Sequence, residues 1–170
     1  MIVSSRMLEF DRITTLYSQE QDRLLLNATL REGGTARVWL TQRMVHRLIP
    51  ALVKIIEPRH ADPVYAEIIA GVSQQKAVER QEPQAPVKVA EPEHEWLVSK
   101  VELKQPQSGA VVVFCSATGQ QARITMNAEL LRQWLSIMRR VYITAEWQGA
   151  EWPDWMAVIP TPETAPKVLH

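Results

Sequence analysis

The histidines and the single cysteine are the side chains best suited to bind a metal ion or attack a substrate. His46, His60, His94 and His170 lie at wide, irregular separations, and none lies at a ligand spacing from Cys115. Zinc sites show short, repeated Cys and His spacings, so we expect no metal. No glycine-rich phosphate loop or nucleophile signature accompanies the serines and aspartates. The sequence therefore predicts a protein that is not an enzyme and needs no cofactor.

Basic and aromatic side chains on short alternating segments offer another chemistry. Successive side chains of a strand point to opposite faces, so the polar and aromatic residues of 35–40 and 121–126 share the face away from the apolar ones. Arginine neutralises phosphate and tryptophan stacks on unpaired bases. A single-stranded nucleic-acid site would use Arg37, Trp39, Lys100, Lys104 and Arg123. The favoured alternative makes Trp39 interdomain core, because the apolar run 111–114 needs both faces covered.

Three tryptophans near the C-terminus form a second candidate surface. Trp147, Trp152 and Trp155 lie within nine residues of one another, in a tail (144–170) that ends in a proline-spaced stretch. Large aromatic side chains seldom stay in water together. They therefore either cover the end of the core or bind a protein partner, and we take them as candidate partner-binding residues.

An internal repeat positions these residues. Gly33, Ala36 and Arg37 recur 86 positions later, without a gap, as Gly119, Ala122 and Arg123. Apolar residues also recur at this offset, among them the pairs Phe10/Trp96, Val38/Ile124, Leu40/Met126, Leu48/Trp134 and Leu52/Met138. The pattern predicts two related units, 10–57 and 96–143.

Each unit changes its apolar period from 2 to 3.6 along the chain, which indicates three strands followed by a helix. Thr41 and Asn127 occupy the same repeat position, and each is a favourable helix N-cap. The fold class is therefore α+β: a tandem duplication of a strand-strand-strand-helix unit that forms a pseudo-two-fold domain, with the two meanders pairing or facing each other.

The connection 58–95 combines a helix and a linker. Asp62 and Pro63 form a favourable helix start, so we expect a helix from 63 to about 80. Residues 82–95 contain three prolines and few large apolar side chains, which is typical of an acidic, extended or disordered linker.

Composition limits the classes of function. Across 170 residues, 19 basic and 19 acidic side chains give no net charge, which argues against a general polyanion binder. No apolar stretch approaches the roughly 18 residues that a spanning helix needs, so we expect no membrane contact and a cytoplasmic location. One cysteine cannot form an internal disulfide.

The segment 123–131, Arg-Ile-Thr-Met-Asn-Ala-Glu-Leu-Leu, runs from a strand into an N-capped helix after a meander. This architecture resembles the PUR-repeat, Whirly and transcription-cofactor families of single-stranded nucleic-acid binders, and the resemblance implies a binding surface on the sheet. Those families have four or more strands per unit and a strong excess of basic residues. This chain has three recognisable strands per unit and no excess of basic residues. Separately, 38–43 with Arg47, Leu48 and Pro50 is similar to segments of uncharacterised bacterial proteins.

The sequence leads to two function hypotheses. The first is a non-catalytic binding or assembly protein that acts through a protein partner or through self-association. The alternative is single-stranded nucleic-acid binding through the sheet face, which the balanced charge of the chain does not favour.

Overall fold

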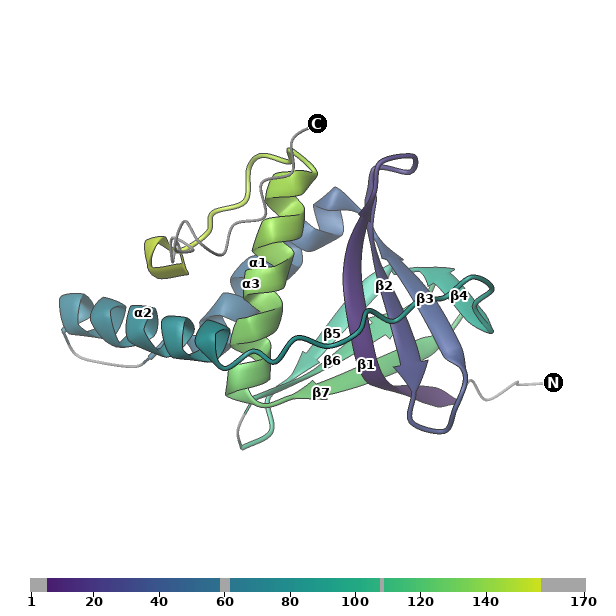
Figure 1. The fold of residues 1–170 in the computed structure, drawn as a ribbon, viewed down its shortest axis with the longest axis horizontal. Helices are drawn as coiled ribbons and strands as arrows, with labels where there is room; N and C mark the ends of the chain where they lie inside the picture. The colour runs from purple at the N-terminus through teal and green to yellow at the C-terminus, as the bar shows by residue number, and fades with distance from the viewer. Residues whose placement is uncertain (1–5, 59–61, 108, 157–170) are drawn as a thin grey trace.

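The computed structural model describes residues 6–58, 62–107 and 109–156. These residues form an α+β fold in which a curled sheet of seven strands lies beside three α-helices (Figure 1). The elements, in chain order, are β1 (Met7–Ser18), β2 (Arg23–Leu30), β3 (Thr35–Leu40), α1 (Gln42–Ile56), α2 (Pro63–Glu79), β4 (His94–Leu97), β5 (Lys100–Lys104), β6 (Ala110–Cys115), β7 (Gln121–Met126), α3 (Ala128–Thr144) and a short 3-10 helix, η1 (Asp154–Met156).

The sheet has the strand order β4-β3-β2-β1-β7-β6-β5. The meanders β1-β2-β3 and β5-β6-β7 are antiparallel, whereas β1 pairs with β7 and β3 pairs with β4 in parallel. Only residues 98 and 99 separate β4 from β5, which lie at the two ends of this order. The Val98 N–H donates to the Trp39 carbonyl at 2.9 Å, and the Ser99 N–H to the Cys115 carbonyl at 2.8 Å. The two ends of the sheet are therefore joined through one continuous stretch of chain, which explains the curl.

Several elements lie 86 positions apart, and we call two residues at this separation counterparts. β3 begins at Thr35 and β7 at Gln121, while α1 begins at Gln42 and α3 at Ala128. The two parallel strand pairs follow the same offset. Leu8 lies opposite Ala122 in the β1–β7 pair, and their counterparts His94 and Ala36 lie opposite each other in the β3–β4 pair.

The 86-residue offset does not hold along the whole of β1. Arg12 lies opposite Thr29, whereas Lys100, 88 positions after Arg12, lies opposite Cys115, the counterpart of Thr29. From His94 to Lys100 the chain therefore has two more residues than the matching stretch of β1 from Leu8 to Arg12. The prediction of three strands in the second unit is wrong, because the chain pairs with β3 as β4 and then crosses to pair with β6 as β5.

The core lies between the inner face of the sheet and the apolar faces of α1 and α3. The alternation in β3 and β7 places every second side chain inward, as the sequence predicts. The largest fully buried side chains are Phe10, Phe114, Leu24, Leu26, Leu40, Ile49, Leu52, Leu131, Leu135 and Met138. Both predicted caps are present: Thr41 Oγ1 accepts from the Met44 N–H at 3.2 Å, and Asn127 Oδ1 accepts from the Leu130 N–H at 2.8 Å.

The connection begins with the predicted helix, α2, which projects away from the sheet in Figure 1. Asp62 caps this helix by accepting from the Val64 N–H at 3.0 Å. The buried Gln74 side chain donates to the Arg132 carbonyl of α3 at 2.9 Å. One face of α2 is thus fixed on α3.

The chain between α2 and β4 has no helix or strand, but it packs on the sheet instead of lying free in solvent. Val87 and Val89 are buried, and the Val87 N–H donates to Thr14 Oγ1 at 2.8 Å. Arg37 on the outer face of β3 donates to the Val89 carbonyl. We call residues 82–93 the strap, because they lie across the outer face of β1, β2 and β3.

Candidate functional site

The outward side of α1 is strongly basic. Its apolar residues recur with the helical period, so Val45, Leu48 and Ile49 face the core. Arg43, Arg47 and Lys54 are exposed, and the helix contains no acidic side chain. In the described part of the chain, none of these three cations forms an ion pair.

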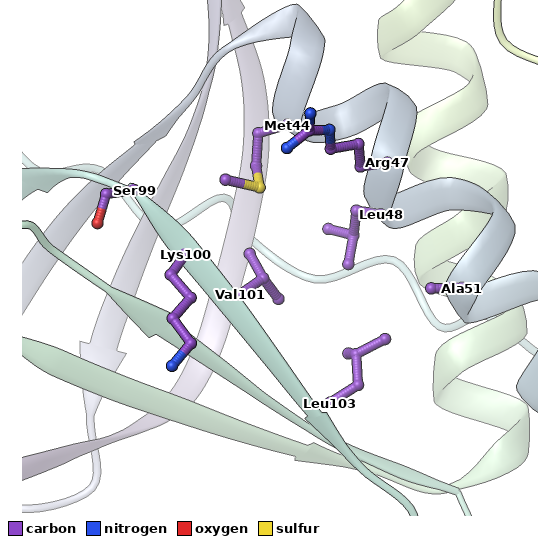
Figure 2. Close-up of a pocket in the computed structure, with 8 residues that line it drawn as sticks. All are labelled: Met44, Arg47, Leu48, Ala51, Ser99, Lys100, Val101 and Leu103. Carbon is purple, nitrogen blue, oxygen red and sulfur yellow. The ribbon is translucent and has the colours of Figure 1, made fainter.

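A groove lies between α1 and β5 (Figure 2). It has a volume of about 260 Å³ and is lined by Met44, Arg47, Leu48, Ala51, Ser99, Lys100, Val101 and Leu103. Figure 2 shows Met44 and Leu48 reaching from the helix toward Val101 and Leu103 on the strand. The floor of the groove is therefore apolar, which is typical of sites that bind apolar groups.

Two cations flank this apolar floor and differ in their availability. Arg47 extends from α1 at the rim and is exposed. The Lys100 ammonium points away from the helix and pairs with Glu102 at 2.8 Å. This pair raises the pKa of Lys100 and lowers the pKa of Glu102, mainly through the hydrogen bond between them. Arg47 is thus the charge most available to a molecule in the groove.

The groove is lined by an α1 residue, Leu48, that is smaller than its counterpart on α3. Trp134, the counterpart of Leu48, is buried and packs edge-on against Phe114. Its indole N–H donates to Thr15 Oγ1 on β1 at 3.1 Å. Ile137 is the counterpart of Ala51. The space between α3 and β1 is therefore filled, whereas the corresponding space between α1 and β5 is open.

The two helices also differ in what covers them. Gln133, the counterpart of Arg47, donates to the Ala77 carbonyl of α2 at 2.9 Å. Arg47 itself remains exposed. Within the described residues, a helix therefore covers the α3 position, while the corresponding α1 position faces solvent.

The predicted nucleic-acid residues lie on the outer face of the sheet, as the alternation indicates. Trp39 is half-buried there, and its indole N–H donates to Glu95 Oε2 at 3.2 Å. The favoured interpretation, that Trp39 is interdomain core, is wrong. The two meanders meet edge to edge rather than face to face, so neither covers the outer face of the other.

Three of the four predicted cations on this face have acidic partners. Arg37 hydrogen-bonds Asn27 Oδ1 at 2.8 Å and pairs with Glu95 at 3.5 Å. Its counterpart Arg123 pairs with Glu9, which is the counterpart of Glu95. Arg123 lowers the pKa of the Glu9 carboxyl through this hydrogen bond and through its charge. Lys100 pairs with Glu102 as described above, and Lys104 is exposed at the end of β5.

An apolar row on the same face was not predicted. Leu16, Leu25, Trp39 and Leu97 lie directly opposite one another across four neighbouring strands. Leu16 and Leu97 are exposed. The sequence could not reveal this row, because its members meet only through strand register.

The tail tryptophans lie against the core. Trp147 is buried, and its indole N–H donates to Asp22 Oδ1 at 2.8 Å. Trp152 and Trp155 are half-buried and pack on the core. This placement supports the first alternative, that they cover its end. Hydrogen bonds from the Tyr17 hydroxyl, and secondarily from the Trp147 indole, lower the pKa of Asp22.

Among the described residues, the histidines and the cysteine share no site. His46 contacts the Tyr142 hydroxyl at 2.5 Å, and His60 and His170 lie outside the described residues. Cys115 is buried, and this burial raises the pKa of its thiol. Among the residues that the structure describes, no three His, Cys, Asp or Glu side chains are placed to hold a metal. None of the described helices has the length and apolar content needed to cross a bilayer.

Comparisons with protein-family models, with curated proteins and with solved structures gave no match to this chain.

Proposed function

We propose that this chain is a non-catalytic binding protein that holds an apolar, acidic segment of a protein partner in the groove between α1 and β5. The half-buried groove residues Met44, Val101 and Leu103 would contact the apolar side chains of that segment. Arg47, with the neighbouring Arg43, would pair with its carboxylates. Charge complementarity of this kind raises the rate of encounter and excludes basic partners.

The observation that carries the proposal is the open groove beside a helix with three unpaired cations. We further propose that the chain is a tandem duplication, in which α3 and β1 represent the closed version of the same interface. Trp134 fills that version, whereas Leu48 and Ala51 line the open α1 version, which could receive side chains from another molecule.

Single-stranded nucleic acid is the second candidate, supported by the half-buried Trp39 beside Arg37 on the outer face. It is disfavoured because Arg37, Arg123 and Lys100 already pair with carboxylates. Phosphate would have to displace these partners, so the gain from neutralising it would be reduced.

A peptide titration tests the proposal. The probes are a helical peptide with leucines along one stripe and glutamates elsewhere, and the same peptide with lysine in place of each glutamate. We expect the acidic peptide alone to bind. The double variant Leu48→Trp with Ala51→Ile, which introduces the residue types of the α3 side, and Arg47→Glu should each weaken binding at least tenfold.

Arg140→Glu is the matched control, because Arg140 is an exposed helical arginine with no ion pair among the described residues. It should bind the acidic peptide as the parent does. If the acidic peptide bound the Leu48→Trp with Ala51→Ile variant as tightly as the parent, or did not bind the parent, the proposal that the groove binds this peptide would be refuted. A parallel titration with oligo-dT would support the nucleic-acid alternative if binding depended on Trp39.

A further inference from the structure

One side of β5 has no partner strand. β5 lies at one end of the sheet order, and within the described residues it pairs only with β6. A strand that is paired on one side leaves alternate backbone N–H and C=O groups pointing away from its partner. In the described part of the chain, no backbone or side-chain group hydrogen-bonds to this side of β5. The strand therefore keeps a row of unpaired backbone donors and acceptors.

The groove runs along this same strand. Val101 and Leu103 line it, and Figure 2 shows both side chains directed toward α1, whereas Lys100 points away from the helix. Side chains alternate along a strand. An extended segment lying beside β5 would therefore direct every second side chain into the groove, against Val101 and Leu103, and the others toward the side of Lys100 and Lys104.

The unpaired backbone of β5 distinguishes an extended occupant from a helical one. A helix satisfies its backbone groups internally, so a helical segment would fill the groove with side chains and leave those of β5 unpaired. An extended segment would supply both the side chains and the missing hydrogen bonds. Peptides that add a strand to a sheet edge gain affinity from these main-chain bonds and specificity from pockets for alternate side chains.

The charges of β5 indicate which strand can pair with it. Antiparallel pairing of β5 with its copy in a second molecule, centred on Glu102, would place Lys100 opposite Lys104 and Glu102 opposite Glu102. Like charges directly opposite each other destabilise a strand pair, and lysines on an edge strand commonly prevent self-pairing. Lys104 is exposed and forms no ion pair among the described residues. A strand with acidic residues opposite the two lysines meets these charges favourably.

We propose that the partner segment binds in an extended conformation and adds as a further strand to the free side of β5. This inference rests on the proposed function, and it names the conformation and the residue pattern of the segment. The alternate side chains that enter the groove are apolar and pack against Val101 and Leu103. The intervening side chains are acidic beside Lys100 and Lys104 and uncharged beside Glu102.

Calorimetric titration with short peptides tests the added strand. The probe has the core Glu-Leu-Thr-Leu-Glu, which reads the same in both directions and places threonine opposite Glu102. Its control has lysine in place of each glutamate. We expect the acidic probe to bind, more tightly than the helical acidic peptide, and the lysine form not to bind. Lys104→Glu should weaken binding about threefold, whereas Arg140→Glu should leave it unchanged.

Methylation of the peptide backbone is the decisive step. An N-methyl group removes an N–H donor and keeps the side chain, and only every second N–H of an added strand points to its neighbour. One probe is methylated at both leucines and another at the glutamates and the threonine. One of the two should lose about tenfold in affinity, and the other should bind nearly as the parent probe does. Amide hydrogens of β5 should also exchange more slowly in the complex, whereas those of β7, which lies between β1 and β6, should not change.

The outcomes separate this inference from the proposed function. Equal effects of the two methylations, or binding of the helical peptide without binding of the extended probe, would overturn the added strand and leave the groove as a binding site. Binding of neither acidic peptide to the parent would overturn both proposals.

Discussion

Replacing Trp134 and Trp39 by alanine should have very different effects on stability. Trp134 is only 3% exposed. Truncating a buried tryptophan costs about 3–5 kcal/mol, and removing the indole donor from the Thr15 hydroxyl adds about 1 kcal/mol. Trp39 is half-buried on the outer face and hydrogen-bonds the exposed Glu95, so Trp39→Ala should cost about 1 kcal/mol.

Urea unfolding followed by far-ultraviolet circular dichroism is the suitable assay, because the six tryptophans of the chain would make fluorescence ambiguous. Trp134→Phe is the second variant, since Trp134→Ala could exhaust the stability of a small domain. It keeps a ring but loses the N–H donor, so we expect a cost of about 1–2 kcal/mol. Equal costs for Trp39→Ala and Trp134→Ala would refute the assignment of the two tryptophans to opposite faces.

Three further predictions concern other parts of the fold. The pKa of Asp22 is lowered in the folded protein, so its contribution is fully present above its ordinary pKa and is lost as the pH falls through the lowered one. Asp22→Asn should therefore reduce the dependence of the urea midpoint on pH below about pH 4. Gly109 has a φ of +85°, and a Cβ there would lie 2.0 Å from the Met126 carbonyl oxygen. Gly109→Ala should thus cost at least about 2 kcal/mol, and Gly33→Ala, where φ is also positive but nothing lies within 4 Å, should cost only about 1 kcal/mol in melting experiments. Val87→Asp buries a carboxylate between the strap and the sheet and should lower stability by roughly 1–3 kcal/mol in urea unfolding, whereas Val64→Asp, at an exposed position, should not.

The local elements could be predicted because short-range chemistry determines them. Thr41, Asp62 and Asn127 each cap a helix at the expected residue. Alternation correctly assigned the inner and outer faces of β3 and β7. Such patterns depend on neighbours within a few positions along the chain, so one sequence is sufficient to read them.

The closure of the sheet and the position of the strap could not be predicted. The apolar second strands indicated that both faces are covered, and the other meander was the obvious cover. In the structure the outer face of the first meander is covered in part by the strap, in which Val87 and Val89 are buried. Two valines in a proline-rich acidic segment carry no periodic signal, so composition alone indicated a free linker.

The groove residues were likewise missed, although the sequence held a trace of them. The pair Leu48/Trp134 is apolar at both positions and so predicts only a helix stripe, and the pair Ala51/Ile137 carries no separate signal. The size difference at both pairs has a meaning only when β5 and β1 are known to face these helices. A difference in side-chain volume between two positions 86 residues apart can therefore indicate a groove, but only when the tertiary arrangement around both positions is known.

The open groove is difficult to attribute to stability alone. Larger apolar side chains at 48 and 51 would bury more surface, at about 25 cal/mol for each Å² removed from water, and the α3 side of the same fold accommodates Trp134 and Ile137. A protein under selection for stability only would have a route to close the groove. Sites that retain an unfavourable local arrangement, here an apolar surface beside an unpaired Arg47, are commonly those that function requires.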